Sequence, residues 1–260
     1  MNQALPNPAI AHVTSTVQRL LADGNAEKSR VDAVLSGTGR RPDLRSDTFQ
    51  AILRELFHLR LGCDFIADSL LSPSWWEAHH LYQLMKLGDP ARTAAGYLHR
   101  IAEGAFLSTL MHLESFVRAL NLALDRAGGT ALGDNHARHR IALFEKRIKP
   151  SFSNLHEFFD LMATMRHAIT NHGLYYSEKY PSLTIRYRSK AYVFKNHAPP
   201  SCLQSDVLLE RIGDTIALLA QVCQDPAVAA LPAFDDPFGR VRLSETETVF
   251  ARTAQHSAPP

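Results

Sequence analysis

The chain has few cysteines, and no two of them lie close together. Cys63, Cys202 and Cys223 are far apart in the 260-residue sequence, so neither a CxxC zinc site nor a disulfide framework is predicted. A sparse, odd set of cysteines favours a reducing compartment. The first eight residues lack a positive segment followed by an apolar core, and no window approaches the apolar length of a membrane span. We therefore expect a cytoplasmic protein without a membrane partner.

Charge of one sign is not in excess either. Lys and Arg total 28 and Asp and Glu total 26, while hydrophobic residues make up 45% of the chain. This composition is ordinary for a folded domain and excludes a chain that is disordered throughout. It also excludes a bulk basic coat for nucleic acid, although a local basic site remains compatible with it.

Several catalytic signatures are missing. The sequence has no GxxxxGK[ST] loop, no GxSxG elbow and no HExxH pair. His79–His80 and His136–His139 have no Cys or carboxylate at ligand spacing, so we read them as surface histidines of helices. We therefore predict neither a metal ion nor a cofactor.

Helical periodicity dominates what is present, so the fold class we predict is all-α with a short β-hairpin before the last helix. Pro90 favours a helix start because its missing N–H costs nothing at the first helical position. Gly173 favours a helix end, since glycine commonly follows one. The predicted helices cover residues 10–21, 26–35, 46–66, 75–84, 90–127, 135–149, 155–171 and 203–223, and the predicted strands cover 183–188 and 191–195.

The loop-forming composition after residue 35 and the polar, proline-rich end of the chain suggest three parts. Residues 1–45 would form an N-terminal helical extension, either packed on the rest or serving as an arm that binds a partner. Residues 46–225 would form the helical domain. Residues 226–260 would form a loosely ordered C-terminal tail.

One segment, residues 165–173, carries the strongest indication of chemistry. Arg166 follows Leu155, Phe159 and Met162 along one helical stripe, so it emerges from or beside an apolar face. A guanidinium there needs a carboxylate partner, a wet groove or an anionic ligand, because burying it unpaired is expensive. His172 follows six residues later, where the helix should end. The pair thus combines a planar cation with a titratable base.

This pair suits metal-independent cleavage of RNA. An imidazole can move the proton of a ribose 2′-hydroxyl near neutral pH. A guanidinium can hold phosphate oxygens and offset the charge that develops in the transition state. Attack of the 2′-oxygen on phosphorus would leave a 2′,3′-cyclic phosphate, and DNA could not react in this way.

The segment resembles the R-x4–6-H motif of the HEPN superfamily, and the order of helices over residues 89–223 fits that family as well. The resemblance implies a HEPN-like helical bundle that forms a homodimer, with two motifs facing each other in an RNA-cleaving cleft. It further implies a toxin or defence role, with an antitoxin or regulatory protein as partner. Arg166 would contact phosphate, His172 would be the acid/base, and His167 and Asn171 would orient the substrate or the pair. Other members of the superfamily are non-catalytic scaffolds or modules that bind RNA or nucleotides.

Three points stay open. Asn171 occupies the position that His takes in many relatives, with His172 one residue further on. A second pair within the R-x4–6-H spacing, Arg92–His99, fits a solvated helix face, and with 13 histidines in the chain such pairs arise by chance. Glu114 can either pair with Arg118 four residues later or line the cleft and orient Arg166 or His167.

The predicted hairpin also has two interpretations. Basic and aromatic residues alternate along it, which is typical of a surface on which RNA bases stack, but an ordinary exposed hairpin has the same pattern. The residues concerned are Arg186, Tyr187, Arg188, Lys190, Tyr192 and Lys195. Together these observations predict a metal-independent endoribonuclease, with a non-catalytic dimeric interaction or RNA/nucleotide-binding module as the alternative.

Overall fold

The computed structural model describes residues 8–35, 43–79, 90–125, 136–152, 154–179 and 181–235. Its fold is predominantly helical with a small antiparallel hairpin, as predicted. The elements are α1 Pro8–Leu35, α2 Leu44–Phe65, a π-helical turn Ile66–Leu70, α3 Pro73–Ala78, α5 Pro90–Asp125, α6 His136–Lys146, α7 Leu155–Thr170, β1 Ser182–Tyr187, β2 Lys190–Lys195, a 3₁₀ turn Ser201–Leu203, α8 Ser205–Gln224 and α9 Pro226–Ala229. No described helix is long and apolar enough to cross a membrane.

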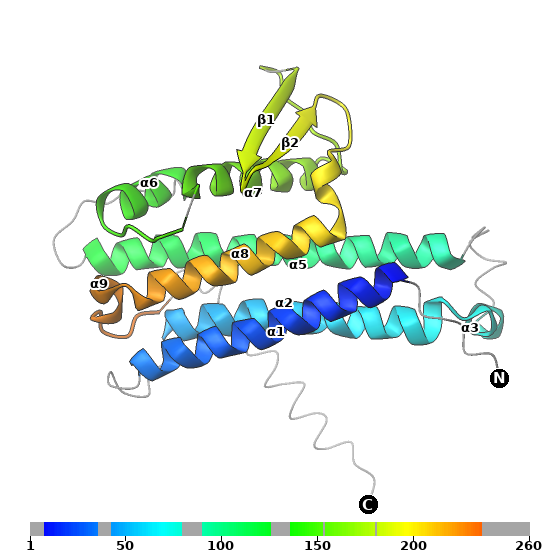
Figure 1. Cartoon of the computed structure of the whole chain (residues 1–260), viewed down its shortest axis with the longest axis horizontal. Helices are drawn as coiled ribbons and strands as arrows, with labels where there is room; N and C mark the ends of the chain where they lie inside the picture. The colour runs from blue at the N-terminus through cyan, green and yellow to red at the C-terminus, as the bar shows by residue number, and fades with distance from the viewer. Residues whose placement is uncertain are drawn as a thin grey trace, which may run out of the picture.

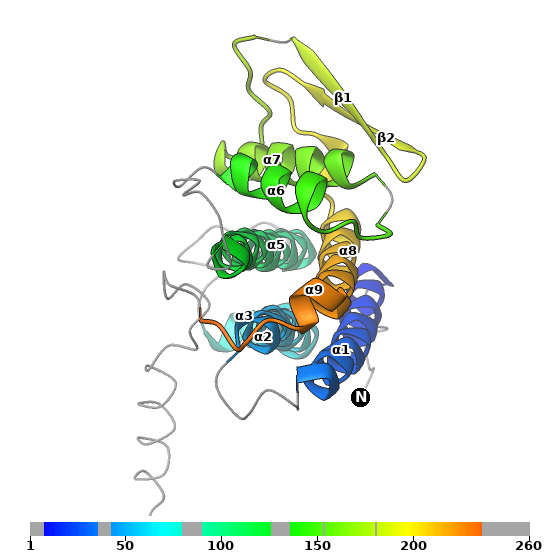
Figure 2. The same ribbon diagram turned by 90° about the vertical axis from the view of Figure 1, so that its left-hand side faces the viewer.

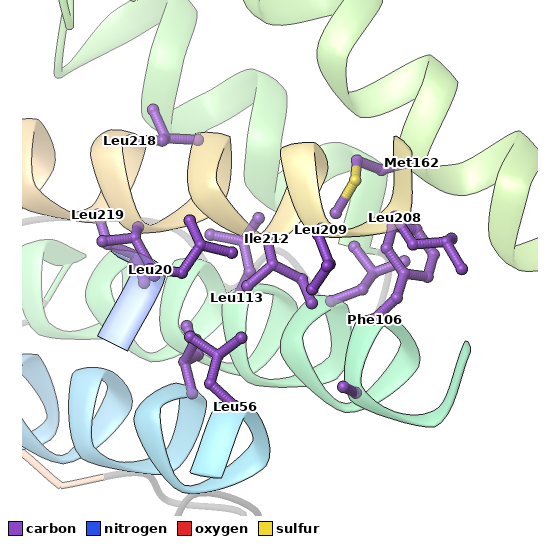
Figure 3. Packing of buried hydrophobic residues seen from close by; sticks show 14 of the residues in the cluster. Leu20, Leu56, Phe106, Leu113, Met162, Leu208, Leu209, Ile212, Leu218 and Leu219 are labelled. Carbon is purple, nitrogen blue, oxygen red and sulfur yellow. The ribbon is translucent and has the colours of Figure 1, made fainter. Parts of the chain in front are cut away.

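Four long helices form a bundle. Helices α1, α2, α5 and α8 pack in a ring, each against the next, and α6 and α7 form a further layer above α5 and α8 (Figures 1 and 2). The hairpin lies on the far side of α7 from the bundle (Figure 2). The apolar face of α8 joins the layers: Figure 3 shows its leucines among side chains of α1, α2, α5 and α7, including Leu20, Leu56, Leu113 and Met162.

Helix α1 is continuous where the sequence predicted two short helices with a break at Asp23–Gly24. Gly24 is buried at the crossing of α1 and α2, and a Cβ atom added there would lie 2.7 Å from Leu53 Cδ2. The glycine therefore permits close approach of two helices rather than ending one. As a result, the extension expected for residues 1–45 contributes a full helix to the bundle.

A fully buried arginine joins the start of α2 to the segment after α8. Arg45 Nε and Nη2 bind the two carboxylate oxygens of Asp43 at 2.8 and 2.5 Å, and Asp43 also caps α2. Arg45 Nη1 donates to the carbonyl oxygen of Val228 at 2.6 Å, and Nη2 donates to that of Leu231 at 3.1 Å. Residues 226–235, the described part of the predicted tail, are thus packed; residues 236–260 lie outside the described residues.

The hairpin turns one residue earlier than predicted. Tyr187 pairs with Lys190 in the ladder, so Arg188 and Ser189 form the turn, both with positive φ (47° and 63°). This two-residue geometry matches the right-handed twist of the strands even without Asn-Gly. A buried network then fixes the hairpin to α8. Tyr187 Oη donates to Asp214 Oδ2 at 3.2 Å, and Arg211 Nη1 donates to Tyr192 Oη at 3.1 Å.

Candidate active site

The C-terminus of α7 ends in a Schellman motif with histidine in the position that glycine usually occupies. The N–H of Gly173 donates to the carbonyl of Ala168 at 2.9 Å, and His172 before it has φ of 59°. A left-handed backbone is costly for a residue with a Cβ atom, by about 1–2 kcal/mol. The predicted helix end is therefore correct. However, two successive residues after the helix have positive φ, the exposed His172 and then Gly173.

Arg166 reaches from α7 to α5. Its Nη1 donates to both carboxylate oxygens of Glu114, each at 2.8 Å. The Glu114 side chain is 11% exposed, whereas that of Arg166 is 40% exposed, so part of the guanidinium still faces solvent. The structure thus supplies the carboxylate partner that the stripe on α7 required, and it brings Glu114 to Arg166.

A second arginine shares the field of Glu114. Burial lowers the pKa of Arg140 on α6, and the charge of Arg166 lowers it further, while Glu114 and Asp160 oppose this effect. Two guanidinium groups, Arg140 and Arg166, therefore share their surroundings with two carboxylates, Glu114 and Asp160. Positive and negative charge are thus balanced here, and the exposed edge of Arg166 is what remains open to an anion.

His167 and Asn171 hold the turn that carries His172. His167 Nε2 hydrogen-bonds the carbonyl oxygen of Tyr176 at 2.8 Å. Asn171 Nδ2 donates to the carbonyl oxygen of His167 at 2.9 Å. His167 therefore ties the end of α7 to the segment that follows it, and Asn171 bonds back onto the last turn of α7, so both side chains have a structural task.

His172 lines an open groove of about 470 Å³. One wall comes from α5, where Glu103 Oε1 lies 3.2 Å from His99 Nε2 and Oε2 accepts a 2.9 Å hydrogen bond from Arg100 Nη1. A further wall comes from the segment before α8. The lining residues are His99, Arg100, Glu103, His172, Gly173, Leu174, Pro199, Pro200, Ser201, Leu203 and Gln204.

The two motif residues occupy neighbouring stretches of the same helix face. Glu103 and Glu114 are eleven residues apart on α5, which is about three turns or 16 Å, so both point to one side. His172 lies in the groove at Glu103, while Arg166 lies at Glu114 and is not among the groove's lining residues. The described residues therefore place His172 and Arg166 at two positions along one face of α5, about 16 Å apart.

The hairpin is not an exposed aromatic surface. Tyr187 and Tyr192 are buried, and their hydroxyl groups are engaged by Asp214 and Arg211. Burial raises the pKa of Tyr187, and burial likewise raises the pKa of Asp214 against the opposing charge of Arg211. Burial of these aromatics contradicts the hypothesis that RNA bases stack on them, since stacking needs accessible rings.

His99, Arg100 and Glu103 were missed as site residues. The sequence offered a local signal: His99 and Glu103 are four apart, and so meet on one helix face. The interpretation of Arg92–His99 as a solvated face overlooked it, because the wall opposite α5 is formed by segments far away in the sequence. Among the described residues, no group of three or more His, Cys, Asp or Glu side chains is arranged to hold a metal ion.

Comparison with models of known protein families, with curated proteins and with solved structures finds no match to this chain.

Proposed function

We propose that the protein is a metal-independent endoribonuclease of the HEPN type. The observation that carries this proposal is the exposed His172, held in a left-handed turn at an open groove that also contains Arg100. Strained backbone at an accessible titratable side chain is typical of a functional site. In the proposed reaction, His172 accepts the proton of the ribose 2′-hydroxyl, and the exposed part of Arg166 binds a backbone phosphate.

The chemistry determines the products. The bond between the 2′-oxygen and phosphorus forms as the bond between phosphorus and the 5′-oxygen breaks, leaving a 2′,3′-cyclic phosphate and a 5′-hydroxyl. The homodimer, the toxin or defence role and the antitoxin partner belong to the same proposal, and they rest on the resemblance of residues 166–172 to the HEPN motif. Cytoplasmic location rests on the sparse, unpaired cysteines, all three of which are buried.

The test is cleavage of structured and unstructured RNA in EDTA by the purified protein, by His172→Asn and by Arg166→Ala. Asn suits the left-handed position, so the first variant should fold and lose about 10²–10⁴-fold in rate. His197→Asn is a matched control, because His197 is also exposed and has φ of 57°. Arg92→Ala, at an exposed position of α5, is the control for Arg166. RNA left intact by wild-type protein would refute the proposal.

A second candidate is a non-catalytic module that binds RNA, a nucleotide or a partner protein. The Arg166–Glu114 ion pair favours it, because that contact could serve structure alone. Specific binding of RNA without cleavage, unaffected by His172→Asn, would support this module.

A further inference from the structure

The groove at His172 contains a second imidazole, which has no part in the proton transfer proposed for His172. His99 lies on the α5 wall, one helix turn before Glu103, and its side chain is 39% exposed. Cleavage of RNA needs two proton transfers: one from the attacking 2′-hydroxyl and one to the departing 5′-oxygen. A groove with imidazoles on two walls can supply both.

The environment of the two histidines differs. Glu103 is 5% exposed, and its carboxylate contacts His99 through one oxygen and Arg100 through the other. A carboxylate held in this way fixes the orientation of an imidazole. In the described part of the chain, no carboxylate lies within ion-pair distance of His172. His99 is thus the imidazole of the groove that a buried carboxylate orients, and His172 is the one that none orients.

We infer that His99, oriented by Glu103, is the general acid of the reaction, and that Arg100 binds the scissile phosphate beside it. This inference rests on the proposed endoribonuclease function. His172 takes the proton of the 2′-hydroxyl while the 2′-oxygen bonds to phosphorus. The phosphorus–5′-oxygen bond breaks, and the protonated His99 delivers its proton to that oxygen. Neither a metal ion nor an oxidant is needed for this balance.

The positions of the groups fit these roles. An in-line displacement places the attacking and departing oxygens on opposite sides of phosphorus, so acid and base must come from different walls. His99 belongs to α5, and His172 belongs to the turn after α7. Arg100 uses one nitrogen on Glu103, while its side chain is 68% exposed, which leaves donors for phosphate oxygens.

The experiment compares two RNA substrates that differ in one leaving atom. The first has the natural 5′-oxygen at the scissile bond, and the second has a bridging 5′-sulfur, which departs as a thiolate without needing a proton. His99→Ala should lose about 10²–10⁴-fold on the natural substrate and recover most of that loss on the sulfur substrate. His172→Asn should lose a comparable factor on both substrates, because attack by the 2′-hydroxyl still needs its base.

Glu103 is a positioning residue and needs its own readout. Glu103→Gln keeps the side-chain length but removes the charge, so it should slow the natural substrate less than His99→Ala does. The sulfur substrate should restore its rate as well, and a purely structural defect would slow both substrates equally. His58→Ala, at an exposed position of α2 away from the groove, is the matched histidine control. Far-ultraviolet circular dichroism and melting temperature monitor the fold of each variant.

The outcomes separate this inference from the function on which it rests. If His99→Ala cleaves the natural substrate as fast as wild type while His172→Asn does not, the endoribonuclease function is supported and the role of His99 as general acid is refuted. An equal deficit of His99→Ala on both substrates would also overturn its role as acid. If wild-type protein cleaves neither substrate, both proposals fail together.

Discussion

Two arginine–carboxylate pairs of this molecule, Arg45 with Asp43 and Arg166 with Glu114, differ in what surrounds them. Arg45 is completely buried, and its nitrogens are engaged by Asp43 and by two main-chain carbonyl groups. Arg166 uses a single nitrogen on Glu114, and its side chain is 40% exposed. The chemistry of the two pairs is the same, but only the second can still accept a ligand.

The comparison teaches that burial and the number of engaged donors, rather than the presence of an ion pair, separate an arginine closed to ligands from one that can still bind an anion. A guanidinium has five N–H donors. At Arg45 four of those donors bind Asp43 and two carbonyl groups after α8, and the side chain is fully buried, so no anion can reach it. At Arg166 the pair orients the side chain and leaves its outer edge to solvent.

The largest effect is expected where the buried pair is broken. Arg45→Met leaves the Asp43 carboxylate without its partner and two carbonyl groups without donors, so the free energy of unfolding should fall by about 3–5 kcal/mol. Urea denaturation measures this change. Arg92→Met, at an exposed position, should change stability by no more than about 0.5 kcal/mol. A loss below about 1 kcal/mol at Arg45 would remove the distinction between the two pairs.

Arg166→Ala should lower the cleavage rate more than it lowers the stability of the fold. Cleavage at RNA concentrations below KM should fall by about 10–10²-fold, because one charge-assisted contact to a backbone phosphate is lost. Unfolding should change by no more than about 1 kcal/mol, because a half-exposed ion pair contributes little. Initial rates and urea denaturation on the same preparations check both values. Unchanged cleavage together with a large loss of stability would make Arg166 a second structural arginine.

Two glycines allow the effect of close packing on stability to be compared in the same way. Gly24→Ala adds a methyl group that would lie 2.7 Å from Leu53 Cδ2, and the resulting overpacking should cost about 1–3 kcal/mol. Gly96 in α5 has nothing within 4 Å of the added atom, so Gly96→Ala should instead stabilise by about 0.5–1 kcal/mol. Melting temperatures that shift in the same direction for both variants would contradict this account of the α1–α2 crossing.

Local signals predicted much of this fold. Pro90 marked the start of α5, and the Asn171–Gly173 segment marked the end of α7, because caps and breakers act within a few residues. The hairpin was placed correctly to within one residue. The prediction that Gly24 ends a helix was wrong, because the glycine is needed to make room for Leu53, which lies on another helix.

The candidate site was only partly accessible to the same reasoning. The stripe on α7 indicated that Arg166 needs a partner, and Glu114 was among the candidates although it lies 52 residues away. The groove at His99 could not be predicted, because it forms only where the segment after α7 and the segment before α8 approach α5. Arg45 was equally hidden, because its carbonyl partners lie 183 and 186 residues along the chain.

The smallest effect concerns the backbone strain at His172, which has no counterpart in the buried pair of Arg45. His172→Asn should raise the free energy of unfolding by a few tenths of a kcal/mol, up to about 1 kcal/mol, because Asn tolerates φ near 59° better. His197→Asn should give a similar gain for the same reason. Only the first change should abolish cleavage. Equal gains in stability, with cleavage lost only in His172→Asn, would show that the strain costs the same at both positions and that only the His172 imidazole is needed for cleavage. A loss of stability in His172→Asn would mean that this imidazole contributes to folding.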